Sequence, residues 1–213
     1  MNFQKKEGKK LRYLISVPEK AQKLKKLRII FFMHGYGDSM NGISQICNFL
    51  NPNNVYVFLN APFKMNISFD FEGYRWFEFP LDYEEFKFSQ EAINYSIDEI
   101  ISELNLNFHE IFIGGFSQGG MMTLHNNYKG RLDGLIILGS RLVHRDSEFN
   151  LNKNIRIFMS HGVNDVVIPI EEAKSTVKFL KEKINDVFYK EFPIGHELSP
   201  DQLSELNKWI DGD

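Results

Sequence analysis

Short apolar segments, each long enough for one buried strand, recur along the chain and alternate with stretches of helical spacing. The apolar segments are Ile29–Met33, Val55–Leu59, Ile111–Ile113, Leu135–Leu138 and Ile155–Met159. An unbroken apolar run is typical of a strand that is covered on both faces, as in a parallel sheet. Because parallel strands need crossover connections, the alternation predicts an α/β fold with a mostly parallel sheet.

Three of the intervening stretches place apolar side chains on one face of a helix. The stripes are formed by Met40, Ile43, Cys47 and Leu50, by Ile93, Ile97, Ile100, Ile101 and Leu104, and by Ala173, Val177, Leu180 and Ile184. A last helix has clear start signals, because Ser199 can cap it, Pro200 suits its first position and Gln202 completes a capping box. We therefore expect helices on both faces of the sheet.

The length of 213 residues favours one domain over two. A hydrophobic content of 43% is sufficient for a sizeable core, and we find no internal repeat, low-complexity tract or Gly/Ser linker. We expect a single domain over residues 1–213.

One stretch, Ala61–Phe88, departs from this alternation because it is rich in aromatic residues and has no clear period. Such a long irregular segment predicts a loop with a functional role. Its rings either cover an edge of the sheet or line a pocket.

Charge and composition exclude several classes of protein. The net charge of −3 gives no basic excess of the kind that nucleic-acid binding requires. The longest apolar run, Ile29–Met33, is far shorter than a membrane helix, and the N-terminal segment lacks the features of a secretion signal. Cys47 is the only cysteine, which excludes an intramolecular disulfide and suits a reducing compartment. We expect a cytoplasmic protein without integral membrane association or nucleic-acid partners.

The segment Gly115-Phe116-Ser117-Gln118-Gly119 matches the pattern G-x-S-x-G. The residues before it predict a strand and those after it predict a helix, which is the setting of a nucleophile elbow. In such a tight turn, side chains two positions before and after the serine would collide, which explains the two glycines. Ser117 would then project its hydroxyl above the sheet.

A serine hydroxyl needs a base to attack at neutral pH, and the base needs a carboxylate to orient it. In a doubly wound sheet both partners should lie on loops at the carboxyl ends of later strands. Asp165 follows the segment Ile155–Met159, and His196 follows the alternating stretch 187–192. The order Ser117, Asp165, His196 is that of the α/β hydrolases.

Other residues could take these two roles. His144 and His161 are alternative bases on predicted loops, and Asp146 is an alternative carboxylate because it also follows a strand. The remaining histidines, which are His34, His109 and His125, have no spacing typical of a catalytic metal site. We expect no metal.

An acyl-transfer reaction also needs hydrogen-bond donors for the negative oxygen of its tetrahedral intermediate. The backbone N–H of Gln118 is the first candidate by its position after the serine. The second is the N–H of Tyr36, since it lies in a glycine-containing loop, residues 34–38, directly after the strand Ile29–Met33. Alternatively, this loop is an ordinary strand-to-helix turn that Asp38 or Ser39 caps.

At this point the chain resembles the carboxylesterase, phospholipase and acyl-protein thioesterase family of α/β hydrolases. The shared blocks are F-M-H-G-Y-G-D, N-A-P, G-Y-R-W-F, G-G-F-S-Q-G-G, S-H-G-V-N-D-V-V-I-P and P-I-G-H-E. The resemblance implies an α/β-hydrolase fold with Ser117 as the nucleophile, Asp165 and His196 as its partners, and the amides of Tyr36 and Gln118 as the oxyanion hole. It further implies that Trp76 lies beside the acyl pocket.

We therefore expect a serine hydrolase that cleaves carboxylic esters or thioesters through an acyl-enzyme, without a cofactor. Too few residues separate Leu138 from Ile155 for a lid domain, so the site should be open to a small ester or thioester and to an acylated protein surface. Two alternatives are a serine peptidase on the same fold and a catalytically silent binding module. The sequence leaves the oligomeric state open.

Overall fold

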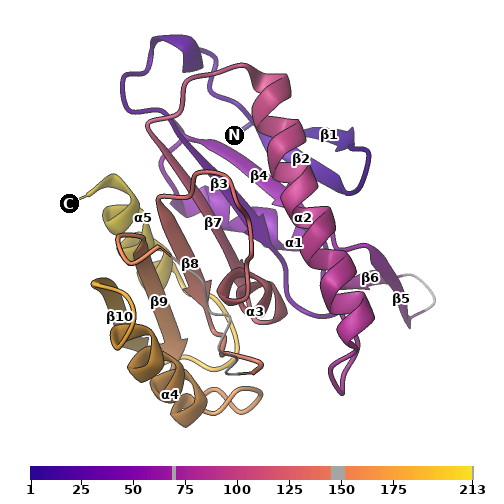
Figure 1. The fold of residues 1–213 in the computed structure, drawn as a ribbon, viewed down its shortest axis with the longest axis vertical. Helices are drawn as coiled ribbons and strands as arrows, with labels where there is room; N and C mark the ends of the chain where they lie inside the picture. The colour runs from indigo at the N-terminus through magenta and orange to yellow at the C-terminus, as the bar shows by residue number, and fades with distance from the viewer. Residues whose placement is uncertain (69–70, 145–151, 213) are drawn as a thin grey trace.

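The computed structural model describes residues 1–68, 71–144 and 152–212. Within these ranges, eight strands form one sheet in the order β1-β2-β4-β3-β7-β8-β9-β10 (Figure 1). The strands are β1 (Gln4–Glu7), β2 (Arg12–Ser16), β3 (Arg28–Met33), β4 (Val55–Leu59), β7 (Glu110–Phe116), β8 (Gly134–Leu138), β9 (Arg156–Gly162) and β10 (Asp186–Phe192). β1 and β2 pair in an antiparallel manner, whereas β4, β3 and β7 to β10 are parallel. The predicted mostly parallel sheet is confirmed.

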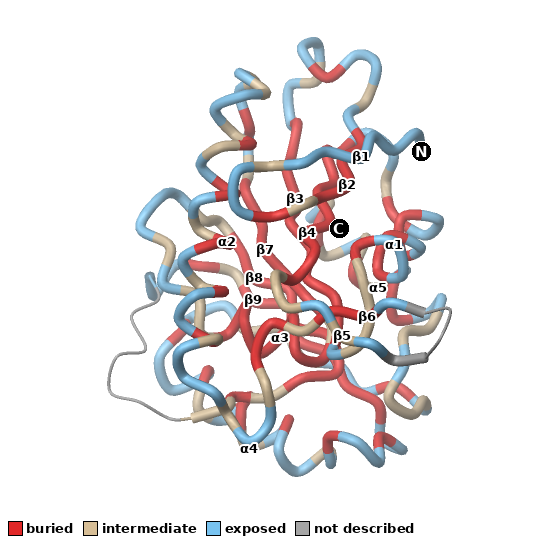
Figure 2. The backbone as a smooth tube through the Cα atoms, turned by 90° about the vertical axis from the view of Figure 1, so that its right-hand side faces the viewer, coloured by how far each residue is buried: buried red, intermediate tan, exposed pale blue. Residues whose placement is uncertain are grey.

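Helices cover both faces of this sheet. They are α1 (Met40–Ile43), α2 (Tyr83–Leu104), α3 (Gln118–Leu124), α4 (Ile170–Lys181) and α5 (Pro200–Asp211), with 3₁₀ turns at Ala21–Lys23 and Ser44–Phe49. Side chains alternate along each strand, so Phe31 belongs to the core cluster that also contains residues of α2, α3 and α4, whereas Phe32 belongs to the cluster that contains residues of α1 and α5. Figure 2 shows the resulting buried centre, with exposed residues concentrated in the outer loops and helix surfaces.

The predicted start of the last helix is also confirmed. Ser199 caps α5 by accepting a hydrogen bond from the Gln202 backbone, and the Gln202 side chain completes the capping box. The stripe that contains Met40 and Cys47 is buried as expected, but only its first turn is an α-helix before the chain continues as a 3₁₀ helix.

The prediction of a long loop over Ala61–Phe88 is wrong for most of that stretch. β5 (Phe63–Ser68) and β6 (Phe71–Arg75) form a separate antiparallel hairpin, and α2 begins at Tyr83. Asp82 caps α2 by accepting the N–H groups of Glu84 and Glu85. The aromatic residues at the start of α2 obscure its helical period. The signals that could have predicted this start are the capping residue Asp82 and the acidic residues Glu84 and Glu85 in the first turn.

The connection between β8 and β9 carries no helix or strand in its described parts, residues 139–144 and 152–155. The parallel strands all end at the same edge of the sheet as β7, where α3 begins (Figure 1). Loops that follow these strands therefore lie close together, although their residues are far apart in the sequence.

Candidate active site

Ser117 lies on a sharp turn between β7 and α3. Its backbone adopts φ 53° and ψ −116°, a region that residues with a side chain rarely occupy. Its N–H donates to the carbonyl oxygen of Leu138, and its own carbonyl oxygen accepts the hydroxyl of Ser140 at 2.7 Å. A Cβ atom at Gly115 would overlap the backbone of Gly119, so the turn has the crowding that the two glycines of the motif predict.

His196 connects Ser117 to Asp165. Its Nε2 atom lies 2.9 Å from the Ser117 hydroxyl oxygen, and its Nδ1 atom lies 2.7 Å from Oδ2 of Asp165. The imidazole packs against the ring of Phe116, with 4.9 Å between the ring centroids. The histidine side chain keeps 17% of its surface exposed, whereas the carboxylate of Asp165 is fully buried. A solvent-accessible imidazole is therefore held between a buried acceptor and a serine hydroxyl.

The hydrogen-bond pattern assigns the proton on the imidazole. An ionised carboxylate only accepts hydrogen bonds, so the proton of a neutral His196 ring lies on Nδ1 and points to Asp165. The lone pair of Nε2 is then free to accept the Ser117 hydroxyl. This arrangement allows the imidazole to take up the hydroxyl proton.

The loop after β9 holds Asp165 in place. Oδ1 of Asp165 accepts the backbone N–H groups of Val167 and Ile168 at 2.9 and 2.8 Å, which leaves Oδ2 for His196. The buried carboxylate therefore accepts hydrogen bonds from three donors, the two backbone N–H groups and His196. These hydrogen bonds replace those to water that the carboxylate loses on burial.

The alternative residues have other surroundings. His161 is buried behind Asp165, where its Nε2 lies 2.8 Å from the carbonyl oxygen of Ile168 and 3.4 Å from Oδ2 of Asp165. The ring of His144 stacks on that of His125, with 4.2 Å between centroids. Asp146 lies outside the described residues. Among the histidines, His196 is the one whose ring nitrogen bonds the Ser117 hydroxyl.

The loop at residues 34–38 brings Tyr36 to the same edge of the sheet. His34 is buried, and its Nε2 accepts the N–H of Ala61 at 3.0 Å, so its proton lies on Nδ1 and points to the carbonyl oxygen of Gly35 at 2.7 Å. Burial lowers the pKa of His34 to about 4, because the charged form would lose its hydration. Neither the backbone N–H of Tyr36 nor that of Gln118 has an acceptor among the described residues.

Trp76 is fully buried, so the structure leaves none of its surface open to a substrate. Its indole N–H donates to the carbonyl oxygen of His34 at 2.9 Å, and its backbone N–H donates to Oε1 of Gln118 at 2.8 Å. A cavity of about 870 Å³ between α2, the 125–133 loop and α4 is lined by neither Trp76 nor Ser117. The position of Trp76 beside an acyl pocket stays a prediction.

Sequence reasoning missed several side-chain contacts that support this site, although it had named the backbone N–H of Gln118. Phe116 packs on the imidazole of His196, Ser140 bonds the backbone of Ser117, and the Gln118 side chain bonds the segment that contains Trp76. Phe116 and Gln118 occupy the two unspecified positions of G-x-S-x-G, so the motif itself carried no signal for the contacts of their side chains. The described residues contain no group of three or more His, Cys, Asp or Glu side chains that could hold a metal ion.

A mostly parallel sheet, a serine on a strand-to-helix elbow, and a histidine and an aspartate on later loops together define the class of α/β hydrolases. The sequence matches the phospholipase/carboxylesterase family model over residues 15–212. The chain belongs to this family and is a hydrolase.

Curated relatives match most of the chain. The acyl-protein thioesterase 1 of Kluyveromyces lactis is 29% identical, and the alignment covers 92% of this chain and 95% of the relative. The acyl-protein thioesterase 1 homolog 1 of Dictyostelium discoideum is 30% identical, with 85% and 88% covered. The similarity therefore extends over nearly the whole length of these proteins.

Solved structures share the fold. The crystal structure of Arabidopsis thaliana SOBER1 superposes with a TM-score of 0.73 at 26% identity and covers 87% of this chain and 98% of that one. A carboxylesterase from Mesorhizobium loti superposes over the full length of both chains with a TM-score of 0.82 at 17% identity. These matches confirm the predicted α/β-hydrolase fold. None of the helices in the described ranges combines the length and the apolar character that crossing a membrane requires.

Proposed function

We propose that the protein hydrolyses carboxylic esters or thioesters through an acyl-enzyme on Ser117, with His196 as the general base and Asp165 as the residue that orients it. The observation that carries the proposal is the continuous hydrogen-bonded chain from the Ser117 hydroxyl through His196 to Asp165, with distances of 2.9 and 2.7 Å. These distances are within the range required for direct proton transfer.

In the first half of the reaction, Ser117 Oγ forms a bond to the carbonyl carbon of the substrate, while its proton moves to Nε2 of His196. The resulting imidazolium is stabilised by the Asp165 carboxylate that accepts from Nδ1. When the tetrahedral intermediate collapses, the carbon–oxygen or carbon–sulfur bond breaks. His196 returns its proton to the leaving alcohol or thiol, and an ester of Ser117 remains.

The negative oxygen of the intermediate accepts hydrogen bonds from the backbone N–H groups of Tyr36 and Gln118. Both donors are free of other acceptors among the described residues, which supports this role. Gln118 is the first residue of α3, so its N–H lies at the positive end of a helix.

In the second half, water replaces the leaving group. His196 takes a proton from the water, whose oxygen forms a bond to the acyl carbon, and then gives that proton to Ser117 Oγ as the acyl–serine bond breaks. The products are a carboxylic acid and the free serine. No step requires a cofactor.

Thioesters are included in the proposed substrate class because two of the matched relatives are named acyl-protein thioesterases. The leaving group receives its proton from Nε2 of His196, whose side chain keeps 17% of its surface exposed. A large leaving group, including an acylated protein, is therefore compatible with the proposal.

The test is a panel of p-nitrophenyl esters and acyl thioesters of graded chain length, assayed with the wild type and with Ser117→Ala. We expect wild-type turnover and a loss of about four to six powers of ten in Ser117→Ala, with an unchanged circular dichroism spectrum. A fluorophosphonate should label the wild type and not the variant. Turnover of matched peptide amides, assayed beside the esters, would support the peptidase alternative, and absence of turnover and labelling would support the binding module.

A further inference from the structure

The short segment Tyr74–Glu78, which begins in the last two residues of β6, contacts both the loop of Tyr36 and the side chain of Gln118. On one side it bonds the loop of Tyr36 through two backbone hydrogen bonds, from Gly37 to Tyr74 and from Tyr74 to Asp38, each 2.9 Å long. On the other side, the Gln118 side chain bonds two backbone groups of the segment, the N–H of Trp76 and the carbonyl oxygen of Phe77. Two loops from different strands are thereby joined through a third piece of chain.

Trp76 is the residue of this segment that bonds both sides directly. Its indole Nε1–H donates to the carbonyl oxygen of His34 at 2.9 Å, two residues before Tyr36. Its backbone N–H donates to Oε1 of Gln118 at 2.8 Å, and Nε2 of Gln118 donates to the carbonyl oxygen of Phe77 at 2.7 Å. The carbonyl oxygen of Trp76 also accepts the Ser89 hydroxyl of α2 at 2.5 Å. Its backbone is therefore held from two directions.

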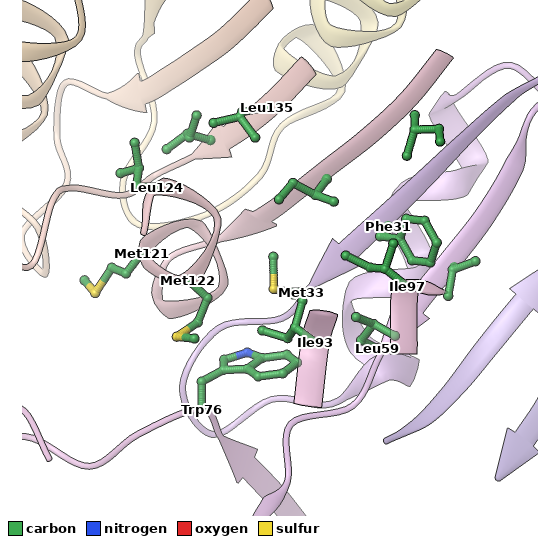
Figure 3. Close-up of a cluster of buried hydrophobic side chains, with 14 of the residues drawn as sticks. Phe31, Met33, Leu59, Trp76, Ile93, Ile97, Met121, Met122, Leu124 and Leu135 are labelled. Carbon is green, nitrogen blue, oxygen red and sulfur yellow. The ribbon is translucent and has the colours of Figure 1, made fainter. Parts of the chain in front are cut away.

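The indole ring has little freedom to move. Trp76 has no exposed surface, and Figure 3 shows its ring among Met33, Met122 and Ile93, which come from β3, α3 and α2. A ring that is packed on three elements holds its N–H at a defined point, and the His34 carbonyl is bound there.

We propose that Trp76 is a positioning residue, which sets the separation of the Tyr36 and Gln118 N–H groups and thereby determines how well they bind the oxyanion. This inference rests on the proposed function. Oxyanion donors act when they lie within about 2.7–3.1 Å of the developing charge, and a displacement of about 1 Å can cost about 100-fold in rate. The role differs from that of an acyl-pocket wall, because the indole bonds the protein backbone and contacts no open surface.

The experiment compares Trp76→Phe with Trp209→Phe. Trp76→Phe removes the indole N–H and keeps an aromatic ring, so the bond to His34 is lost. Trp209 packs against Phe112 and Phe158 on the other face of the sheet, so the same substitution there is a matched control. A third variant, Gln118→Met, removes both side-chain bonds to the segment and keeps the backbone N–H of residue 118. It tests the same connection if Trp76→Phe fails to fold.

Each variant is assayed with a short-chain and a long-chain acyl thioester, and with a trifluoromethyl ketone that forms a tetrahedral adduct on a serine. For Trp76→Phe and Gln118→Met we expect kcat to fall about 10- to 100-fold with KM changed less than about twofold for both chain lengths. The affinity for the ketone should fall by the same factor as kcat/KM. Trp209→Phe should retain wild-type kinetics.

Three outcomes would overturn the proposal. A KM increase confined to the long-chain substrate would make Trp76 an acyl-pocket wall. A lower melting temperature with unchanged kcat and ketone affinity would make it a core residue alone. A loss in kcat without a matching loss in ketone affinity would exclude the oxyanion hole as the affected part. A different result would contradict the proposed function itself: retention of turnover in Ser117→Ala.

Discussion

Gly119 lies directly against the backbone carbonyl group of Met33, and a Cβ atom at position 119 would overlap that carbonyl. Met33 is the last residue of β3, and Gly119 is in the first turn of α3. The contact therefore determines how closely the start of α3 approaches the strand that leads into the Tyr36 loop. Because glycine has no side chain, position 119 allows the two segments that carry the candidate oxyanion donors to lie close together.

We predict that Gly119→Ala destabilises the protein and lowers its activity, since the methyl group must push α3 away from β3. Overpacking of this kind costs about 1–3 kcal/mol, and backbone offers little room to relax. The free energy of unfolding from urea titration measures the effect. Gly195→Ala is the matched control, because a Cβ there meets only the Asn164 carbonyl oxygen at 3.8 Å. Equal stability of the two variants would contradict the prediction.

The backbone conformation at position 117 should make the folded protein more stable with glycine there than with a residue that carries a Cβ atom. Its φ of 53° and ψ of −116° lie in a region that costs about 1–3 kcal/mol for a residue with a Cβ atom. Glycine relieves that strain but gains about 0.4–1 kcal/mol of entropy in the unfolded chain. We therefore expect Ser117→Gly to be more stable than Ser117→Ala by about 1 kcal/mol, with both inactive. A lower urea midpoint for Ser117→Gly at equal slope would show that the turn is unstrained.

Asp165→Asn should preserve the fold and reduce turnover by about 10⁴-fold, the loss measured for the equivalent change in another serine hydrolase. The amide oxygen can still accept the Val167 and Ile168 N–H groups, but the amide nitrogen then faces Nδ1 of His196. Because an NH₂ group only donates, the ring proton moves to Nε2, where it prevents acceptance from Ser117. Steady-state kinetics with an unchanged melting temperature would support this. A loss below about tenfold would make the orienting role of Asp165 untenable.

Stability should fall as pH is lowered, with His34 as one contributor. Burial lowers the pKa of His34 to about 4, below the value of about 6.5 for an exposed histidine. The unfolded chain therefore binds a proton more readily than the native state does. The contribution of neutral His34 to the free energy of unfolding is complete above a pH of about 6.5. It is lost as the pH falls toward 4, by up to about 3 kcal/mol.

Melting temperatures of the wild type and His34→Gln between pH 8 and pH 4 check this expectation. The decline should be shallower in His34→Gln. It should not vanish, because burial also lowers the pKa of His125, to about 3, and that residue acts in the same direction. Parallel curves for the two proteins would mean that His34 does not titrate differently in the folded and unfolded states.

The elements predicted best are those whose signal is local. Val55–Leu59 has the predicted bounds of β4, and the Ser199 capping box begins α5 as expected. The stretch 61–88 was predicted poorly, because its aromatic residues serve two purposes. Some of them, including Trp76 and Phe77, enter the core after the β5–β6 hairpin, whereas Tyr83 begins a helix with its ring exposed. Aromatic composition alone does not separate these cases.

The sequence by itself determined the fold class, since strand and helix periods depend on neighbouring residues, and it identified which serine, histidine and aspartate to consider. Only the tertiary structure decided which of them meet. Ser117 and His196 are 79 positions apart, and their contact exists because parallel strands end at one edge of the sheet. The hydrogen bonds of Trp76 to His34 and Gln118 were likewise beyond sequence reasoning. They depend on the rotamers and packing of side chains from three separate elements, and no local pattern encodes these.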